Sequence, residues 1–230
     1  MILFTSQRSF SRAENIRALY DAYTGEKEFA RLNILRFTNT VDYRDFGLMV
    51  TDEMPAATTG KCLMIGHGGN GLKLFGYDQP FPYVHEDERG LITKAVCASE
   101  GVRELTAKAY GISIENVLPL GMPRTDAIIK GAKQSTKRTH LYAPTYRTQE
   151  EMHPSIDWEY IDTQLTDNEE LIYKPHMLTG DIKVNGLKHI KAASAHVPST
   201  DYIIDCDVLI TDYSSIMFDA MVAGKPVVLF

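Results

Sequence analysis

The stretch that most constrains this chain is residues 204–230, which read as a strand, a polar turn, a helix and a second strand. Residues 207–210 are mostly apolar, residues 211–215 are polar, and apolar residues then recur at helical spacing. We expect Ser214 or Ser215 to cap this helix and Gly224 to end it. Because a helix start has free N–H groups and partial positive charge, the two serines form a candidate phosphate cradle. The alternative is structural, since any strand–helix–strand unit needs a cap and a stop.

Composition and charge exclude several classes of protein. The chain has 230 residues, 44% hydrophobic and 23% charged, which is typical of a soluble globular protein. No apolar run approaches the roughly 18 residues of a membrane-spanning helix, and residues 1–4 are too short for a signal peptide. A net charge of −6 argues against non-specific nucleic-acid binding. We therefore expect a cytoplasmic protein that binds no nucleic acid.

The cysteines and the clustered aspartates give no signal for a metal or a cofactor. Cys62, Cys97 and Cys206 lie far apart among apolar residues, which predicts structural thiols. Four aspartates lie close together in the sequence: Asp205, Asp207, Asp212 and Asp219. Their spacing matches no metal-binding loop. We therefore predict neither a metal ion nor a cofactor.

Strand-like stretches, such as residues 140–143 and 171–173, alternate with helix-like ones, such as residues 100–110, which Gly111 would stop. This alternation predicts parallel sheets covered by helices on both faces. A polar, basic stretch at residues 131–139 separates two such series, so we expect one lobe at residues 1–133 and another at 134–230. The sequence ends on what reads as a central strand. The second lobe has under the roughly 100 residues of a comfortable domain, and we expect it to be incomplete at its C-terminus.

Polar residues follow several predicted strands, at the positions where α/β proteins bind ligands. His67 lies in a glycine-rich turn, where an imidazole would suit a general base, although the glycines also fit a solvated turn. Lys174 and His176 leave a strand two residues apart and would face the same side of an extended chain. Both are candidates to bind a diphosphate, but such residues are also common at strand ends.

Two arginines and an aspartate complete the candidate set. Arg124 and Arg147 follow proline-containing turns and have the planar guanidinium that suits phosphate. Surface arginines paired with nearby acids would give the same pattern. Asp219 lies about one helical turn after Ser215 and is a candidate to accept hydrogen bonds from a ribose or from a phosphate-binding serine. The alternative is an ordinary solvent-facing acid on the helix.

Taken together, these segments resemble the CDP-glycerol glycerophosphotransferase family, the poly(glycerol phosphate) polymerases and primases of teichoic-acid and capsule synthesis. Residues 207–230 are similar to the family's most recognisable stretch, residues 142–147 resemble its Tyr-Ala-Pro-Thr-Trp-Arg motif, and residues 118–126 resemble its Gly-Asn-Pro-Arg-x-Asp motif. The turn at His67 departs from the family's Trp-His-Gly-Thr-Pro-Leu-Lys motif: Gly66 replaces the tryptophan and the spacing to Leu72 is one residue longer.

The resemblance implies two Rossmann-like lobes in a glycosyltransferase-B arrangement, with an acceptor-side first lobe and a nucleotide-binding second lobe. It implies a transferase that uses CDP-glycerol or a related CDP-polyol and a polymer or lipid-linked acceptor, with peripheral contact at the inner face of the cell membrane left open. His67 and His176 fall on the catalytic histidines, and Ser214, Ser215 and Asp219 on the diphosphate-binding motif. The alternatives are a nucleotide-sugar glycosyltransferase or epimerase of the same architecture, and a non-catalytic domain that binds nucleotide or polymer.

Overall fold

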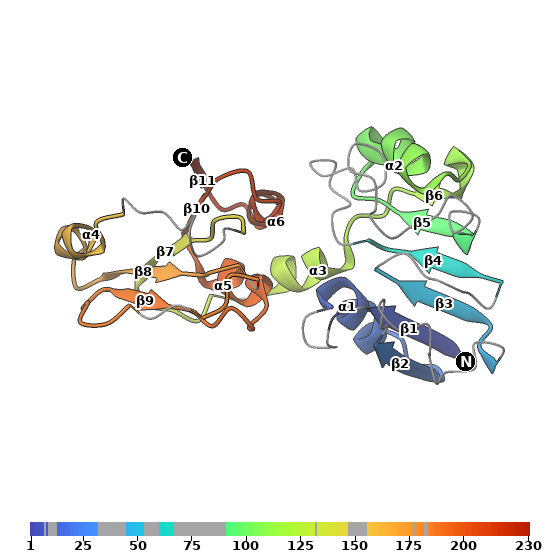
Figure 1. The fold of residues 1–230 in the computed structure, drawn as a ribbon, viewed down its shortest axis with the longest axis horizontal. Helices are drawn as coiled ribbons and strands as arrows, with labels where there is room; N and C mark the ends of the chain where they lie inside the picture. Colours follow the sequence, from blue (N-terminus) through green and yellow to red (C-terminus); the bar gives the residue numbers. More distant parts are fainter. Residues whose placement is uncertain are drawn as a thin grey trace. The chain divides into compact units, whose positions relative to one another are not determined.

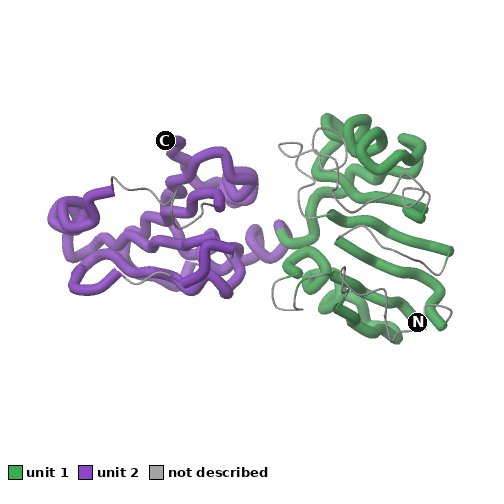
Figure 2. The backbone as a smooth tube through the Cα atoms, in the orientation of Figure 1, with its two compact units in different colours: residues 1–124 green, residues 125–230 purple. Residues whose placement is uncertain are grey.

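The structure is a computed structural model, and it describes residues 1–6, 8, 13–31, 45–52, 60–66, 91–131, 133–146, 156–176, 178–181 and 184–230. The predicted site residues His67 and Arg147 lie outside these ranges. The chain divides into two compact units, Met1–Arg124 and Thr125–Phe230 (Figure 2). Each unit is an α/β structure, as predicted.

Unit 1 is built on a six-stranded sheet with the strand order β2-β1-β3-β4-β5-β6 (Figure 1). Every neighbouring pair is parallel. The strands are β1 (Ile2–Ser6), β2 (Lys27–Arg31), β3 (Leu48–Thr51), β4 (Cys62–Met64), β5 (Lys94–Val96) and β6 (Val117–Leu118). A parallel sheet needs cover on its faces, and apolar residues of α1 (Glu14–Ala22), such as Ile16, pack against Phe4 and Val50 of the strands.

Between β5 and β6 the chain forms η4 (Glu100–Val102), α2 (Arg103–Tyr110) and η5 (Ile114–Asn116). Gly111 ends α2 in the left-handed conformation, with φ of 64°, which confirms the predicted helix stop. Helix α3 (Pro123–Lys130) contains the division between the units.

Unit 2 is built on a five-stranded parallel sheet with the order β11-β10-β7-β8-β9. The strands are β7 (Arg138–Tyr142), β8 (Glu169–Tyr173), β9 (Ile190–Ala192), β10 (Val208–Thr211) and β11 (Val227–Leu229). The helices are α4 (Trp158–Gln164), α5 (Ser199–Asp205) and α6 (Ile216–Val222). Among the strands that the structure describes, β11 lies at an edge of the sheet. Our expectation that it is a central strand of a larger sheet stays a prediction.

The two faces of the unit 2 sheet have separate cores. Leu141 packs with Ile203 of α5 and Ala220 of α6, whereas the next residue, Tyr142, packs with Trp158 of α4. Side chains alternate along a strand, so neighbouring residues of β7 serve opposite faces. Gly224 has φ of 68° directly after α6, which confirms the second predicted helix stop.

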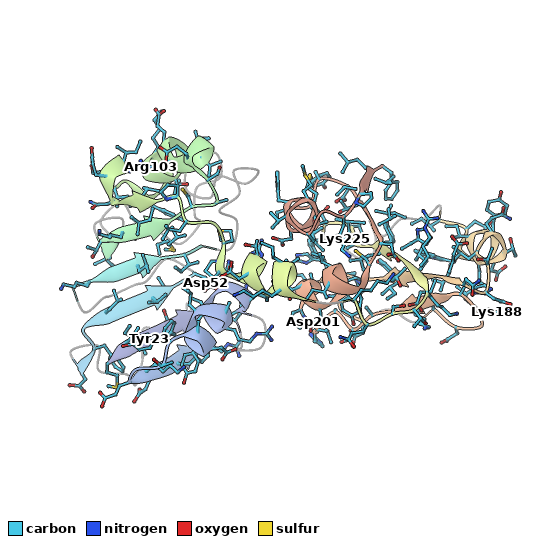
Figure 3. All side chains as sticks on the ribbon, turned by 180° about the vertical axis from the view of Figure 1, so that it is seen from behind. Tyr23, Asp52, Arg103, Lys188, Asp201 and Lys225 are labelled. Atoms are coloured by element: carbon cyan, nitrogen blue, oxygen red, sulfur yellow. The ribbon has the colours of Figure 1, made fainter. Side chains whose placement is uncertain are left out.

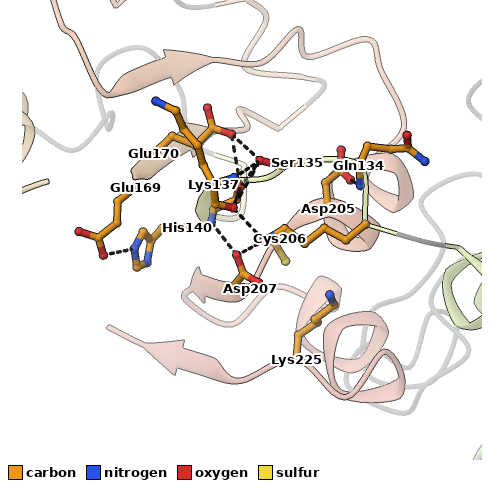
Figure 4. A network of polar contacts seen from close by, with 12 residues as sticks. Gln134, Ser135, Lys137, His140, Glu169, Glu170, Asp205, Cys206, Asp207 and Lys225 are labelled. Carbon is orange, nitrogen blue, oxygen red and sulfur yellow. Dashed lines mark hydrogen bonds and ion pairs between the residues drawn. The ribbon is translucent and has the colours of Figure 1, made fainter. Parts of the chain in front are cut away.

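The polar stretch that we expected to link the lobes is bonded to unit 2, at the amino end of its sheet (Figure 4). Lys133 pairs with Asp207, and the Gln134 N–H donates to Asp205 at 2.5 Å. The buried Glu170 accepts hydrogen bonds from the Ser135 and Thr139 hydroxyls at 3.3 Å each. These contacts explain why the division falls before this stretch, within α3, rather than after residue 133.

Candidate active site

The candidate site is at the carboxyl edge of the unit 2 sheet. Strands β10, β7 and β8 are neighbours and parallel, so the loops that follow them leave the sheet at the same edge. These loops contain residues 212–215 after β10, 143–146 after β7 and 174–176 after β8. The loops after β10 and β8 carry residues that the sequence predicts to act: Ser214, Ser215, Lys174 and His176.

A bidentate contact joins the loops after β7 and β10. The carboxylate of Asp212 accepts a hydrogen bond from the Thr145 N–H at 3.0 Å and another from the Thr145 hydroxyl at 2.7 Å. The Thr211 hydroxyl adds a third bond, to the Ala143 carbonyl, at 2.6 Å. We call the Thr145–Asp212 pair the clamp. Because Asp212 already accepts from two protein donors, its role here is to fix one loop on the other, a role that the sequence did not reveal.

His176 is oriented by its own loop. Its Nδ1 accepts a hydrogen bond from the Leu178 N–H at 3.2 Å, and its ring centroid lies 5.8 Å from that of Tyr146. An imidazole nitrogen that accepts a hydrogen bond carries no proton, so the neutral ring holds its proton on Nε2. Nε2–H is therefore the group of the neutral ring that can donate a hydrogen bond.

Lys174 lies inside the loop that it helps to form. It is 5% exposed, and its ammonium donates to the Pro175 and Ala195 carbonyls at 3.1 and 3.3 Å. A buried ammonium needs such acceptors, since burial of an unpaired charge is costly. In this conformation Lys174 supports the backbone around His176, and its predicted contact with a diphosphate stays a prediction.

Asp181 fixes the far end of the same loop. Its carboxylate accepts from the Ala195 N–H at 2.6 Å and from the Ser194 hydroxyl at 3.1 Å. The bond from the Ala195 N–H holds the pKa of Asp181 below its usual value, and the Ser194 hydroxyl and the charges of His196 and Lys174 act in the same direction. Asp181 was not a sequence candidate, because nothing along the chain indicates that it meets the residues after β9.

The two serines precede α6. Ser215 is the N-cap residue and makes no side-chain cap bond, while the Ser214 hydroxyl accepts from the Ile216 N–H at a long 3.5 Å. The predicted side-chain cap is therefore weak. Both serines are half-buried at the carboxyl edge. Asp219 lies one helical turn later and is buried, at 7% exposure.

Unit 1 brings a different set of residues to the carboxyl edge of its own sheet. The buried Asn15 donates to the Gly66 carbonyl and accepts from the Arg124 N–H, both at 3.0 Å. Arg124 is itself only 7% exposed. Asn15 was missed in the sequence because it reads as an ordinary residue of α1, yet it joins the first helix to the backbone beside Gly66.

Asp52, labelled in Figure 3, directly follows β3. Its exposed fraction is 3%. Among the described residues, its Oδ1 is one of four buried side-chain polar atoms that have no hydrogen-bond partner. Burial raises the pKa of Asp52, and a hydrogen bond from Ser6 and the charge of Arg8 only partly oppose that rise. Burial therefore disfavours the ionised form of this carboxyl group at the edge of unit 1.

Residues that we excluded from the site are accounted for by the fold. All three cysteines are free and buried, as predicted, and burial raises the pKa of Cys62 to about 12 and that of Cys206 to about 11. Within the described ranges, no three His, Cys, Asp or Glu side chains are grouped to hold a metal ion. Asp207 precedes β10 and Asp212 follows it. These two aspartates are close in sequence but lie at opposite ends of the strand.

No helix in the described part of the chain is both long and apolar enough to cross a membrane.

Solved structures show the same fold. The wall teichoic acid polymerase TagF matches with a TM-score of 0.78 at 18% identity, over 99% of this chain and 69% of that one. A putative UDP-N-acetylglucosamine 2-epimerase from Listeria monocytogenes matches with a TM-score of 0.62 at 12% identity, over 99% of this chain and 78% of that one. The predicted fold class is therefore confirmed.

Curated relatives are teichoic acid enzymes. The teichoic acid poly(ribitol-phosphate) polymerase of Bacillus spizizenii is 27% identical over 194 residues, which cover 73% of this chain and 31% of that protein. The teichoic acid glycerol-phosphate primase of Bacillus subtilis is 26% identical, covering 100% of this chain and 66% of that protein. The chain thus spans between about a third and two thirds of these relatives.

A family model described as CDP-Glycerol:Poly(glycerophosphate) glycerophosphotransferase matches residues 48–230, which include both the loops of unit 2 and the edge of unit 1. This match covers well over half of the chain. The resemblance to this family that the sequence indicates is thereby confirmed. The chain belongs to the CDP-glycerol:poly(glycerophosphate) glycerophosphotransferase family.

Proposed function

We propose that this chain is a transferase that moves glycerol phosphate, or a related polyol phosphate, from CDP-glycerol to an acceptor hydroxyl and releases CMP. The proposed setting is the synthesis of teichoic acid or of a capsular polymer. The observation that carries the proposal is the meeting of three loops at the carboxyl edge of unit 2, where parallel α/β sheets bind ligands. Membership in the family supports the choice of donor.

In this proposal unit 2 binds the donor diphosphate. Ser214 and Ser215 offer hydroxyl groups, and Nε2–H of His176, whose Nδ1 accepts from the Leu178 N–H, is proposed to donate to a phosphate oxygen. Lys174 and Asp219 act from buried positions, Lys174 through the loop it supports. Arg147, outside the described residues, follows Tyr146 and is proposed to add a positive charge.

The proposed reaction is an in-line displacement at phosphorus. The acceptor hydroxyl oxygen bonds to the β-phosphorus of CDP-glycerol, and the bond from that phosphorus to the bridging oxygen breaks. CMP leaves with the electron pair, and the hydroxyl proton passes to His67, the predicted base, which lies outside the described residues. Because such transition states gather charge on the phosphoryl oxygens, donors such as His176, and Arg124 as predicted, would supply the catalytic stabilisation.

The acceptor is proposed to be a growing polymer or a lipid-linked chain that ends in a hydroxyl group. Unit 1 is proposed to handle this acceptor, since the predicted base and the edge beside Gly66 belong to it. A lipid-linked acceptor would place the reaction at the inner face of the membrane, with peripheral contact. The proposal involves no metal ion, no organic cofactor and no nucleic acid.

Release of CMP from CDP-glycerol in the presence of a hydroxyl-terminated acceptor tests the function. We expect the wild-type chain to turn over and His176→Ala to lose at least about 100-fold, the scale on which positioned donors contribute to phosphoryl and acyl transfer. His140→Ala is the matched control, because His140 lies on β7 and contacts Glu169 at 3.5 Å, outside the three loops. Equal CMP release by wild type and His176→Ala would contradict the role of His176.

The donor separates this proposal from its main rival. The likeness to an epimerase fold makes a UDP-sugar the alternative donor. Thermal unfolding with CDP-glycerol, CDP-ribitol, UDP-N-acetylglucosamine and CMP compares them, because a ligand raises the melting temperature according to its affinity. We expect the CDP-polyols to give the largest shifts. A larger shift with the UDP-sugar would contradict the proposal, and a shift with CDP-glycerol but no CMP release would support a non-catalytic binding domain.

A further inference from the structure

Two exposed tyrosines adjoin the clamp in unit 2. Tyr146 follows Thr145 and is 43% exposed, while Tyr213 follows Asp212 and is 61% exposed. The two hydrogen bonds from Thr145 to Asp212, at 3.0 and 2.7 Å, hold the loops that carry them together. The clamp therefore joins two loops that each carry an exposed tyrosine, at the carboxyl edge of the sheet.

These rings have polar neighbours that suit the remainder of a nucleotide. Tyr213 immediately precedes Ser214 and Ser215, and Tyr146 lies 5.8 Å, ring to ring, from His176. Aromatic side chains in nucleotide-binding sites commonly stack on bases, because every base has a π-face. Tyr146 and Tyr213 lie beside groups that are proposed to hold a diphosphate, so the base of the same nucleotide is the part of the ligand that their rings suit.

We propose that Tyr146 and Tyr213 form the binding surface for the pyrimidine base of the donor nucleotide, with at least one ring stacked on the base. The inference rests on the proposed function, because it names the part of the same donor that these residues contact. The base is the only part of a CDP-polyol that has a π-face. The polyol, the ribose and the phosphates bind through hydrogen bonds and charge, and a polyol-phosphate acceptor likewise offers nothing for a ring to stack on.

The proposed surface contacts the face of the pyrimidine ring, and stacking by itself does not distinguish one base from another. The clamp gives it the stiffness that makes stacking effective, because tyrosines that are already ordered lose little conformational freedom when a base binds. Tyr146 also joins the two halves of the site, since the same ring that meets the base contacts His176 beside the diphosphate.

Equilibrium binding of CMP and of ribose 5-phosphate to the full chain tests the proposal. The two probes share the ribose and the phosphate and differ in the base, so the ratio of their affinities isolates the contribution of the base. We expect Tyr146→Ala or Tyr213→Ala to weaken CMP binding by about 5- to 100-fold, the range for removal of one base–aromatic stack, and to leave ribose 5-phosphate within about twofold. Tyr146→Phe and Tyr213→Phe keep the ring and should bind CMP as wild type does.

The control is Tyr160→Ala. Tyr160 belongs to α4 rather than to the three loops, and its 62% exposure matches that of Tyr213. We expect this variant to bind both probes normally. Because the ratio compares two ligands on one protein sample, a general loss of folded protein does not change it.

Two outcomes would overturn the inference in distinguishable ways. If both alanine variants keep the wild-type ratio while Ser214→Ala weakens both probes, the tyrosines do not bind the base, and the proposed function stands. If the wild-type chain binds neither CMP nor CDP-glycerol, the proposed function fails and the inference fails with it.

Discussion

Acidic residues at the carboxyl edges of the two sheets have opposite environments. In unit 2, Asp212 and Asp181 each accept two hydrogen bonds from the protein, and these bonds cross between loops. In unit 1, Asp52 is almost completely buried, and one of its oxygens has no hydrogen-bond partner. The first arrangement stabilises the ionised form and the second stabilises the neutral form.

The difference indicates at which edge the positions of the loops are fixed before a ligand binds. In unit 2 the paired acids hold the loops that carry His176 and the two serines, so the proposed donor site is organised before a ligand binds. In unit 1 the order comes from a neutral side chain, Asn15, which joins Gly66 and Arg124, while the buried carboxyl group makes the fold less stable where it is ionised. Variants of the acids therefore test the contrast directly.

The largest effect is expected from loss of the clamp. Asp212→Ala removes two charge-assisted hydrogen bonds and leaves the Thr145 N–H without its acceptor, which should cost about 2–4 kcal/mol of unfolding free energy. CMP release should fall with it, because the loops after β7 and β10 are no longer joined. Denaturant unfolding and CMP release measure the two losses.

Milder substitutions at the clamp provide its controls. Asp212→Asn can still accept from the Thr145 N–H and donate to the hydroxyl, so it should retain much of the stability. Thr145→Val removes only the hydroxyl bond and should cost about 1 kcal/mol. Wild-type stability in Asp212→Ala would show that the clamp does not order the edge.

The sequence predicts the elements of this protein better than it predicts these contacts. The strands expected at residues 140–143 and 171–173 appear as β7 and β8, and the stops at Gly111 and Gly224 are confirmed, because apolar runs and glycine conformations are local properties. The short β9 carries too few apolar residues to stand out and was missed. His176, Ser214 and Ser215 were found as candidates because strand-end positions can be read from the same local pattern.

The contacts that organise the site depend on residues distant in sequence. Thr145 and Asp212 are 67 positions apart, and Asp181 and Ala195 are 14 apart. Lys174 illustrates the limit: its place after β8 was predicted, but its burial against the Ala195 carbonyl follows from the pairing of β8 with β9. No pattern within one segment specifies such a partner, since it depends on the order of strands in the sheet.

The acid of unit 1 should give the protein a stability that falls with rising pH. The folded-state pKa of Asp52 is raised above the ordinary value of 3.8, so between these two pKa values the folded chain binds more protons than the unfolded chain. The cost of ionising the buried Asp52 lowers the free energy of unfolding. This cost is absent below the ordinary pKa of 3.8 and is complete once the pH exceeds the folded-state pKa. We expect Asp52→Asn to be more stable than wild type at neutral pH, with the difference shrinking toward pH 4. Thermal unfolding across that range measures it, and a constant difference between the two proteins would contradict the raised pKa.

The smallest effect, with the opposite sign, is expected from Asp181 in unit 2. Its folded-state pKa is lowered from 3.8, so its stabilising contribution is present above that value and is lost as pH falls through the folded pKa. Asp181→Asn keeps an oxygen for the Ala195 N–H but loses the charge beside Lys174 and His196. The variant should therefore be slightly less stable than wild type at neutral pH and equal to it in acid.

Asp167→Asn is the control for Asp181→Asn, because Asp167 is a surface charge that positions none of the three loops. The pKa of Asp167 is also lowered, in this case by a hydrogen bond from Lys188, on an exposed side chain away from the three loops. Both variants should show the same direction of pH dependence, but only Asp181→Asn should slow CMP release. Of the two acids, only Asp181 is bonded to Ala195, whose carbonyl accepts from Lys174 in the loop of His176. If the two variants release CMP equally fast, the paired acids of unit 2 contribute to stability alone, and the contrast between the two edges does not extend to catalysis.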